Sequence, residues 1–112
     1  MSLPASLLGF DLTGAMTRMG LSDRLFLQLL QGAGESFVQD QELLQNCLVA
    51  HDLSGASECV HRIKGAASTL GATILAREAA LWEAAVADKK RMVDSTPLLN
   101  SLQLTIDSLR TL

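Results

Sequence analysis

The sequence predicts an all-α domain: an antiparallel, up-down-up-down four-helix bundle with a short extra helix at its N-terminal end. Three observations lead to this prediction. Leu and Ala together number 36 of the 112 residues, whereas Val and Ile together number 8 and Tyr is absent, so residues that favour strands are scarce. Apolar residues recur at helical spacings of three and four. The connections between these segments are short, which favours antiparallel neighbours.

The length of the chain fits one domain. Hydrophobic residues make up 48% of the sequence and charged residues 19%, a normal composition for a globular protein. We therefore treat residues 1–112 as a single domain. Within it, we expect residues 1–8 to be flexible or to be a vector-derived start.

Two capping residues predict the first two helices. Asp11 can cap a short helix over about residues 12–18, which Gly20 closes. Ser22 can cap the second helix, whose apolar seam is interrupted by the polar Asp40. The members of this seam are Leu30, Ala33, Phe37, Leu44 and Cys47.

The third helix has the clearest pattern. It can begin at Asp52 or Ser54 and end at Gly71. Between these points, apolar residues follow one another at spacings of 3, 4, 3, 4 and 3, which indicates one buried stripe. The stripe consists of Leu53, Ala56, Val60, Ile63, Ala67 and Leu70.

The last two helices show the same periodicity. The fourth helix ends in a charged run at residues 88–91. The fifth begins with Thr96 as its N-cap and Pro97 as its first residue. The fourth helix buries Leu75, Ala79, Trp82 and Val86, and the fifth buries Leu99, Leu102, Ile106 and Leu109.

Charge and hydropathy exclude several classes of partner. The net charge is −3, so the basic surface of a nucleic-acid-binding protein is missing. No apolar run approaches the ~18 to 20 residues that span a bilayer, so we expect no signal peptide and no direct membrane contact. Two cysteines do not make a disulfide scaffold and fit a reduced, cytoplasmic protein.

His61 is the strongest candidate for chemistry. It lies about 130° from the centre of the apolar stripe of its helix, so it should project into solvent. Lys64 and Gly65, three and four residues further on, share its side of the helix. Imidazole is a nucleophile at neutral pH, and a neighbouring cation would stabilise an anion attached to the ring. A surface His beside a surface Lys has the same spacing, so both interpretations stay open on spacing alone.

Residues 61–72 read His-Arg-Ile-Lys-Gly-Ala-Ala-Ser-Thr-Leu-Gly-Ala. This segment resembles the signature of histidine-containing phosphotransfer (HPt) domains of multistep bacterial phosphorelays, which is His, any residue, Leu or Ile, Lys, Gly, small residues, then Gly-Ala after an apolar residue. The likeness covers about residues 9–110. Downstream, the positions at which the family has Leu, Ala, Leu and Glu are Leu75, Ala79, Trp82 and Glu83. Trp82 departs from the family's Leu.

The resemblance implies the function. His61 would accept a phosphoryl group from an aspartyl phosphate of a response-regulator receiver domain and pass it to another receiver Asp. Lys64 would stabilise the phosphoryl group, and Gly65 would leave room for the receiver. The domain would have no kinase activity and no cofactor of its own, and Mg²⁺ is expected on the partner receiver.

The resemblance also implies a setting for the domain. It would stand alone or belong to a hybrid sensor histidine kinase, in the cytoplasm or as the cytoplasmic portion of a membrane-anchored kinase. Two alternatives stay open. The domain could be the phosphoacceptor domain of a chemotaxis-type histidine kinase, which uses the same His, or a non-catalytic helical adaptor.

Metal sites are weaker candidates. Cys47, His51 and Asp52 lie close together in the sequence, but a zinc site needs about four ligands and no further Cys or His is nearby. A di-iron bundle would need paired Glu-x-x-His motifs, which the sequence lacks. We therefore expect no metal.

Overall fold

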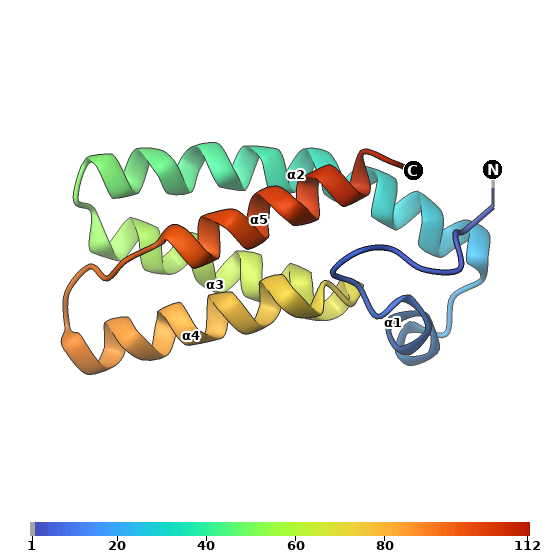
Figure 1. Ribbon diagram of the computed structural model, residues 1–112, viewed down its shortest axis with the longest axis horizontal. Coiled ribbons are helices and arrows are strands. Elements are labelled where there is room, and N and C mark those ends of the chain that lie inside the picture. Colours follow the sequence, from blue (N-terminus) through green and yellow to red (C-terminus); the bar gives the residue numbers. More distant parts are fainter. Residues whose placement is uncertain (1) are drawn as a thin grey trace.

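Five helices follow one another in the computed structural model, which describes residues 2–112 (Figure 1). The described residues form no strand, so the predicted all-α fold is confirmed. Within the same residues, no helix is long and apolar enough to cross a membrane. The helices are α1 (Leu12–Met19), α2 (Asp23–Val49), α3 (Leu53–Leu70), α4 (Thr73–Lys89) and α5 (Thr96–Leu109).

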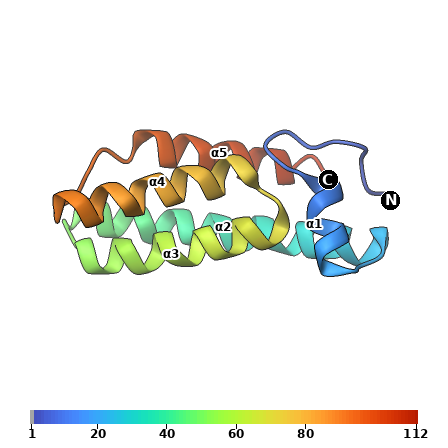
Figure 2. The ribbon, with the colours of Figure 1, turned by 90° about the horizontal axis from the view of Figure 1, so that it is seen from below.

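The four long helices form a closed bundle. Along the chain α2 packs against α3, α3 against α4 and α4 against α5, and α5 returns to pack against α2. Figures 1 and 2 show that neighbouring helices run antiparallel and that α1 lies across one end of the bundle. Both the up-down-up-down bundle and the extra N-terminal helix are therefore as predicted.

The predicted apolar seams meet in the core. On α3, Ala56, Val60, Ile63, Ala67 and Leu70 are buried. The same holds for most predicted members of the other seams: Leu30, Phe37, Leu44, Leu75, Ala79, Trp82, Leu102, Ile106 and Leu109. The members at the edges are only half-buried: Ala33, Cys47, Leu53, Val86 and Leu99. Packing against α1 and against the neighbouring helices adds buried residues that the seams did not predict: Phe26, Leu27, Cys59 and Leu98.

The side chains that cap the first three helices are those predicted from the sequence. Asp11 Oδ1 accepts a hydrogen bond from the Gly14 backbone N–H at 3.1 Å, and Asp52 Oδ1 accepts one from Gly55 at 2.9 Å. Ser22 Oγ accepts one from Leu25 at 3.3 Å. These bonds satisfy backbone donors that a helix leaves free at its start.

The start of α5 differs from the prediction. Ser95 occupies the N-cap, so Thr96 is the first residue of the helix and Pro97 the second. Asp94 Oδ1 accepts hydrogen bonds from both the backbone N–H of Thr96, at 3.0 Å, and its hydroxyl, at 2.8 Å. The hydroxyl of Thr96 is thus a donor to Asp94 and not the cap that the sequence suggested.

The segment before α1 packs on the bundle. Leu7 belongs to the buried core, and the Ser108 hydroxyl of α5 donates to the Leu8 carbonyl at 2.9 Å. The Asp11 backbone N–H donates to the carbonyl of Gly71 at 2.7 Å. Gly71 has φ of 81°, and a Cβ there would come within 2.5 Å of the Asp11 carbonyl oxygen, so glycine is required where α1 meets the end of α3. These contacts fix α3, the helix that carries His61.

Candidate functional site

His61 lies on the outward side of α3, near the middle of the helix. Its side chain is 74% exposed, whereas Val60 and Ile63 on the opposite side are fully buried. The buried side therefore sets the rotation of the helix and turns the imidazole toward solvent, as the helical wheel predicted.

The imidazole has a partner on the neighbouring helix. Its Nδ1 lies 3.1 Å from Oε2 of Glu83, which belongs to α4. The other carboxylate oxygen, Oε1, accepts a hydrogen bond from Nζ of Lys64 at 2.6 Å. One carboxylate thus joins His61 and Lys64, which lie one turn apart on α3.

Glu83 was not among the residues that sequence reasoning placed in the site. The only sequence signal was that its position carries Glu in the resembling family. Trp82, the residue before Glu83, is buried in the core, and Glu83 itself is turned toward α3. That placement depends on how α4 is rotated against α3, which is a tertiary property.

The Glu83 carboxyl group is held in its charged form. Partial burial raises its pKa, but the hydrogen bonds from Lys64 and His61, together with their charges, outweigh burial and bring the pKa below its ordinary value of 4.5. A carboxylate facing Nδ1 is an acceptor, so it favours the tautomer that carries its proton on Nδ1. In that tautomer Nε2 keeps its lone pair.

Gly65, one turn beyond His61, is exposed and has open space beside it. A Cβ at this position would meet no atom within 4 Å, apart from those of its chain neighbours and its own helix backbone. Glycine in the middle of a helix costs roughly 0.5 to 1 kcal/mol relative to Ala. Packing inside the domain therefore gives no reason for a glycine here, and a need for space above the imidazole remains as an explanation.

On the other side of His61, a polar cluster ties α3 to α2. Arg62 Nη2 and Nε donate to Asp40 Oδ1 at 2.9 and 3.1 Å. The Cys59 thiol donates to the Asp40 carbonyl at 3.4 Å, and burial, followed by the charge of Asp40, raises the pKa of this thiol to about 11. Cys59 is therefore a packed, protonated thiol. The polar Asp40 interrupts the apolar seam of α2 because its side chain binds Arg62.

The weak metal candidate is not assembled. Asp52 caps α3 through Gly55, and His51 is an exposed residue with φ of 55° in the turn between α2 and α3. Across residues 2–112, no group of three or more His, Cys, Asp or Glu side chains is placed to hold a metal ion. Both cysteines are free thiols.

Comparison with protein families gives one match. A family model described as "Hpt domain" matches residues 27–112, which include His61, Lys64, Gly65 and Glu83. The match starts within α2, so α1 and the segment before it lie outside it. Comparisons with curated proteins and with solved structures give no match.

Proposed function

The chain belongs to the Hpt domain family, and on that premise we propose that His61 is the residue that carries the phosphoryl group. Hpt domains are phosphotransfer modules of two-component phosphorelays that interact with response-regulator receiver domains and have no kinase activity of their own. The observation that most supports His61 is an exposed imidazole whose Nδ1 faces a carboxylate.

In the proposed reaction, His61 Nε2 attacks the phosphorus of an aspartyl phosphate on a receiver domain. The N–P bond forms as the P–O bond to the aspartate breaks, and the receiver's carboxylate leaves with the electron pair. The imidazole loses no proton: Nδ1 keeps its hydrogen, directed at Glu83, and the ring becomes positively charged. The Glu83 carboxylate, 3.1 Å from Nδ1, balances that charge. The reverse step passes the group to the Asp of another receiver.

Lys64 supplies the second charge. Its side chain is 34% exposed, and its ammonium group is held by the same carboxylate that faces the ring before phosphoryl transfer. A phosphoryl group on Nε2 competes with Glu83 for the three N–H donors of this ammonium group. We propose that Lys64 stabilises the bound phosphoryl group in this way, and that its contribution is modest because the bond to Glu83 must be shared.

The rest of the machinery would come from the partner. Phosphoryl transfer depends mainly on positioning and charge neutralisation, so a nucleophile on a rigid bundle is enough on this side. We propose that the domain uses no cofactor of its own and that the receiver brings Mg²⁺ and its acidic residues. Gly65 would provide clearance for the receiver's active site above the ring.

We further propose a cytoplasmic location, because Cys47 and Cys59 are both free thiols. The domain would act there with at least two receivers, as part of a hybrid sensor histidine kinase or as a separate protein.

The test is incubation with a phosphorylated receiver domain, followed by intact-mass measurement. One acid-labile, base-stable phosphoryl group is expected on the parent and none on His61→Gln. That variant should fold normally, within about 0.5 kcal/mol of the parent, because it removes no buried group. Labelling of His61→Gln would contradict the assignment and turn attention to His51. A separate ATP-bound kinase domain as the donor tests the chemotaxis-type alternative.

A further inference from the structure

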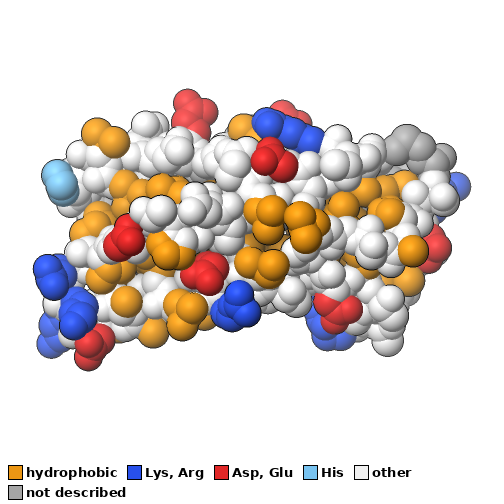
Figure 3. Space-filling model, in the orientation of Figure 1, with side chains coloured by type: hydrophobic (Ala, Val, Ile, Leu, Met, Phe, Trp, Pro, Cys, Tyr) orange, Lys and Arg blue, Asp and Glu red, His pale blue; other side chains and the backbone are white. Residues whose placement is uncertain are grey.

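The outward face of α4 is apolar, although it lies against water. Between Ala79 and Asp88 the helix carries one charged residue, Glu83, and that side chain binds His61 and Lys64 of α3. The residues turned away from the core are exposed, and they are Ala80, Leu81, Ala84 and Ala87. In Figure 3, several hydrophobic side chains are visible at the lower left, where Figure 1 places α4, with charged side chains beside them. Between Ala79 and Asp88 the solvent-facing side of α4 is thus apolar, and an exposed apolar helix face of this kind indicates a partner.

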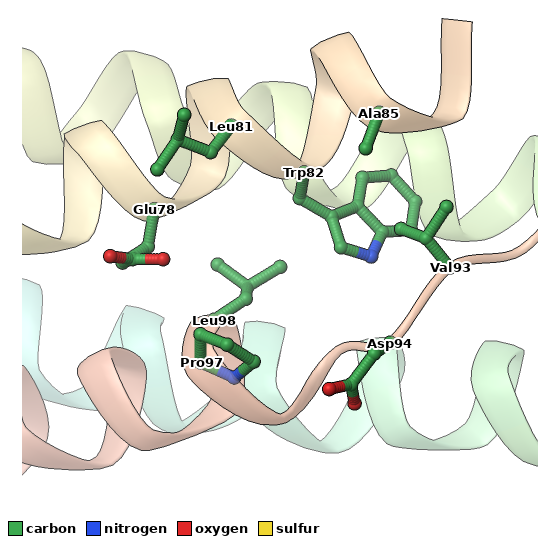
Figure 4. A pocket seen from close by; sticks show the side chains of 8 residues that line it. All are labelled: Glu78, Leu81, Trp82, Ala85, Val93, Asp94, Pro97 and Leu98. Carbon is green, nitrogen blue, oxygen red and sulfur yellow. The ribbon is translucent and has the colours of Figure 1, made fainter. Parts of the chain in front are cut away.

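Leu81 is the most prominent residue of this face. It is 57% exposed and stands at the edge of a cavity of about 310 Å³ between α4 and α5 (Figure 4). Trp82, Val93 and Pro97 also line the cavity. The indole Nε1 of Trp82 already donates to Ser95 Oγ at 3.0 Å. The exposed leucine and the hollow beside it therefore form an uneven apolar surface on which a second helix can pack.

Opposite charges stand at the two ends of the face. Arg77, four residues before Leu81, has a side chain that is 68% exposed, and its one anionic neighbour is Glu78 at a long 3.9 Å. Asp88, four residues after Ala84, is exposed and forms no ion pair with any residue from 2 to 112. Arg77 and Asp88 are separated by roughly 16 Å along the helix, at 1.5 Å per residue, so they cannot pair within one chain.

Four exposed residues of α4 have a spacing that is the same whether the helix is followed forward or backward. Arg77, Leu81, Ala84 and Asp88 follow at intervals of 4, 3 and 4, which places them on one side of the helix. When two copies of α4 lie antiparallel, one register aligns Arg77 with Asp88 of the second copy and Leu81 with Ala84 of the second copy. By symmetry the reverse contacts form at the same time, so the face is complementary to itself in shape and in charge.

We propose that the α4 face, formed by Arg77, Leu81, Ala84 and Asp88, binds a second copy of the chain about a two-fold axis. Each Leu81 packs over the small Ala84 of the other copy, and an ion pair closes each end of the interface. The small side chains let the helices approach closely. His61 and Gly65 belong to α3 and are not part of the pairing face.

Sedimentation equilibrium of the 112-residue chain over a wide concentration range tests the proposal. A reversible dimer is expected, and Leu81→Asp should raise its Kd at least about tenfold, since a central apolar contact becomes a buried charge. The matched control is Leu43→Asp, because Leu43 is a 46% exposed leucine on α2, away from this face. A parent chain that stays monomeric at every concentration would overturn the proposal, as would equal weakening by both variants.

Charge reversal tests the register. Arg77→Asp and Asp88→Arg should each weaken the dimer, because each places like charges opposite one another. The double variant should restore the parent's Kd, since every pair is then again of opposite sign. Circular dichroism on each variant confirms that the helices are intact. Failure of the double variant to recover, with helices intact, would rule out the antiparallel register.

Discussion

Glu83 of α4 and His61 of α3 meet across the helix interface at 3.1 Å, from carboxylate Oε2 to imidazole Nδ1. The contact orients an otherwise exposed ring and favours the tautomer that carries its proton on Nδ1. The same carboxylate holds Lys64 at 2.6 Å. On the proposed function, Glu83 is a positioning residue that would act on the phosphoryl group through His61 and Lys64.

Glu83→Gln should slow phosphoryl uptake from a receiver roughly tenfold. A hydrogen bond to a charged group contributes about 1.5 kcal/mol, and a loss of about 1.4 kcal/mol from the transition state is a factor of ten in rate. The measurement is the single-turnover rate of His61 labelling. The control is Glu78→Gln on the same helix, since Glu78 contacts neither His61 nor Lys64. Nitrogen NMR of the imidazole should show a mixture of tautomers in Glu83→Gln, and an unchanged tautomer would contradict the role given to Glu83.

Stability should fall in acid, in part through Glu83. Because the pKa of Glu83 is lower in the folded chain than its ordinary value of 4.5, the unfolded chain binds this proton more readily. The contribution to the free energy of unfolding is therefore complete above pH 4.5 and is lost as the pH falls through the lower folded value. Denaturant unfolding at a series of pH values should show a shallower acid slope for Glu83→Gln than for the parent. Identical slopes would mean that the carboxylate is not stabilised by its partners.

Much of this site follows from the periodicity of one helix. The stripe on α3 fixes which side of the helix is buried, and so the exposure of His61 could be read from the sequence. The contact with Glu83 could not, because it depends on the rotation of α4 against α3. The same reason explains Leu98, which lies one residue away from the predicted seam of α5 and is buried. Local hydrogen bonding explains the start of α5, where Asp94 competes for the donors of Thr96.

Lys64→Ala should slow phosphoryl transfer about fivefold and leave the melting temperature nearly unchanged. The ammonium group is partly exposed and shared with Glu83, so its electrostatic contribution should be about 1 kcal/mol. Lys89→Ala is the control, since Lys89 is an exposed lysine at the end of α4. The rates should be compared at low salt, where screening is weakest. If Lys64→Ala transfers as fast as Lys89→Ala under these conditions, Lys64 has no part in the site.

Gly65 should act as a clearance device for a protein donor. Because a Cβ at Gly65 meets nothing within 4 Å, Gly65→Ala should fold and gain roughly 0.5 to 1 kcal/mol of stability from the better helix former. Gly65→Gln should also fold, yet its longer side chain stands beside the ring. The nucleophile must come within about 3 to 3.5 Å of the phosphorus, in line with the leaving oxygen, so the receiver's active site must approach the ring closely.

Gly65→Gln should therefore lose most transfer from a phosphorylated receiver, whereas transfer from acetyl phosphate, a small donor, should be affected much less. The quantity to measure is the ratio of the two rates in each variant. Equal slowing with both donors would mean that the side chain disturbs His61 itself, and the clearance role would then be wrong.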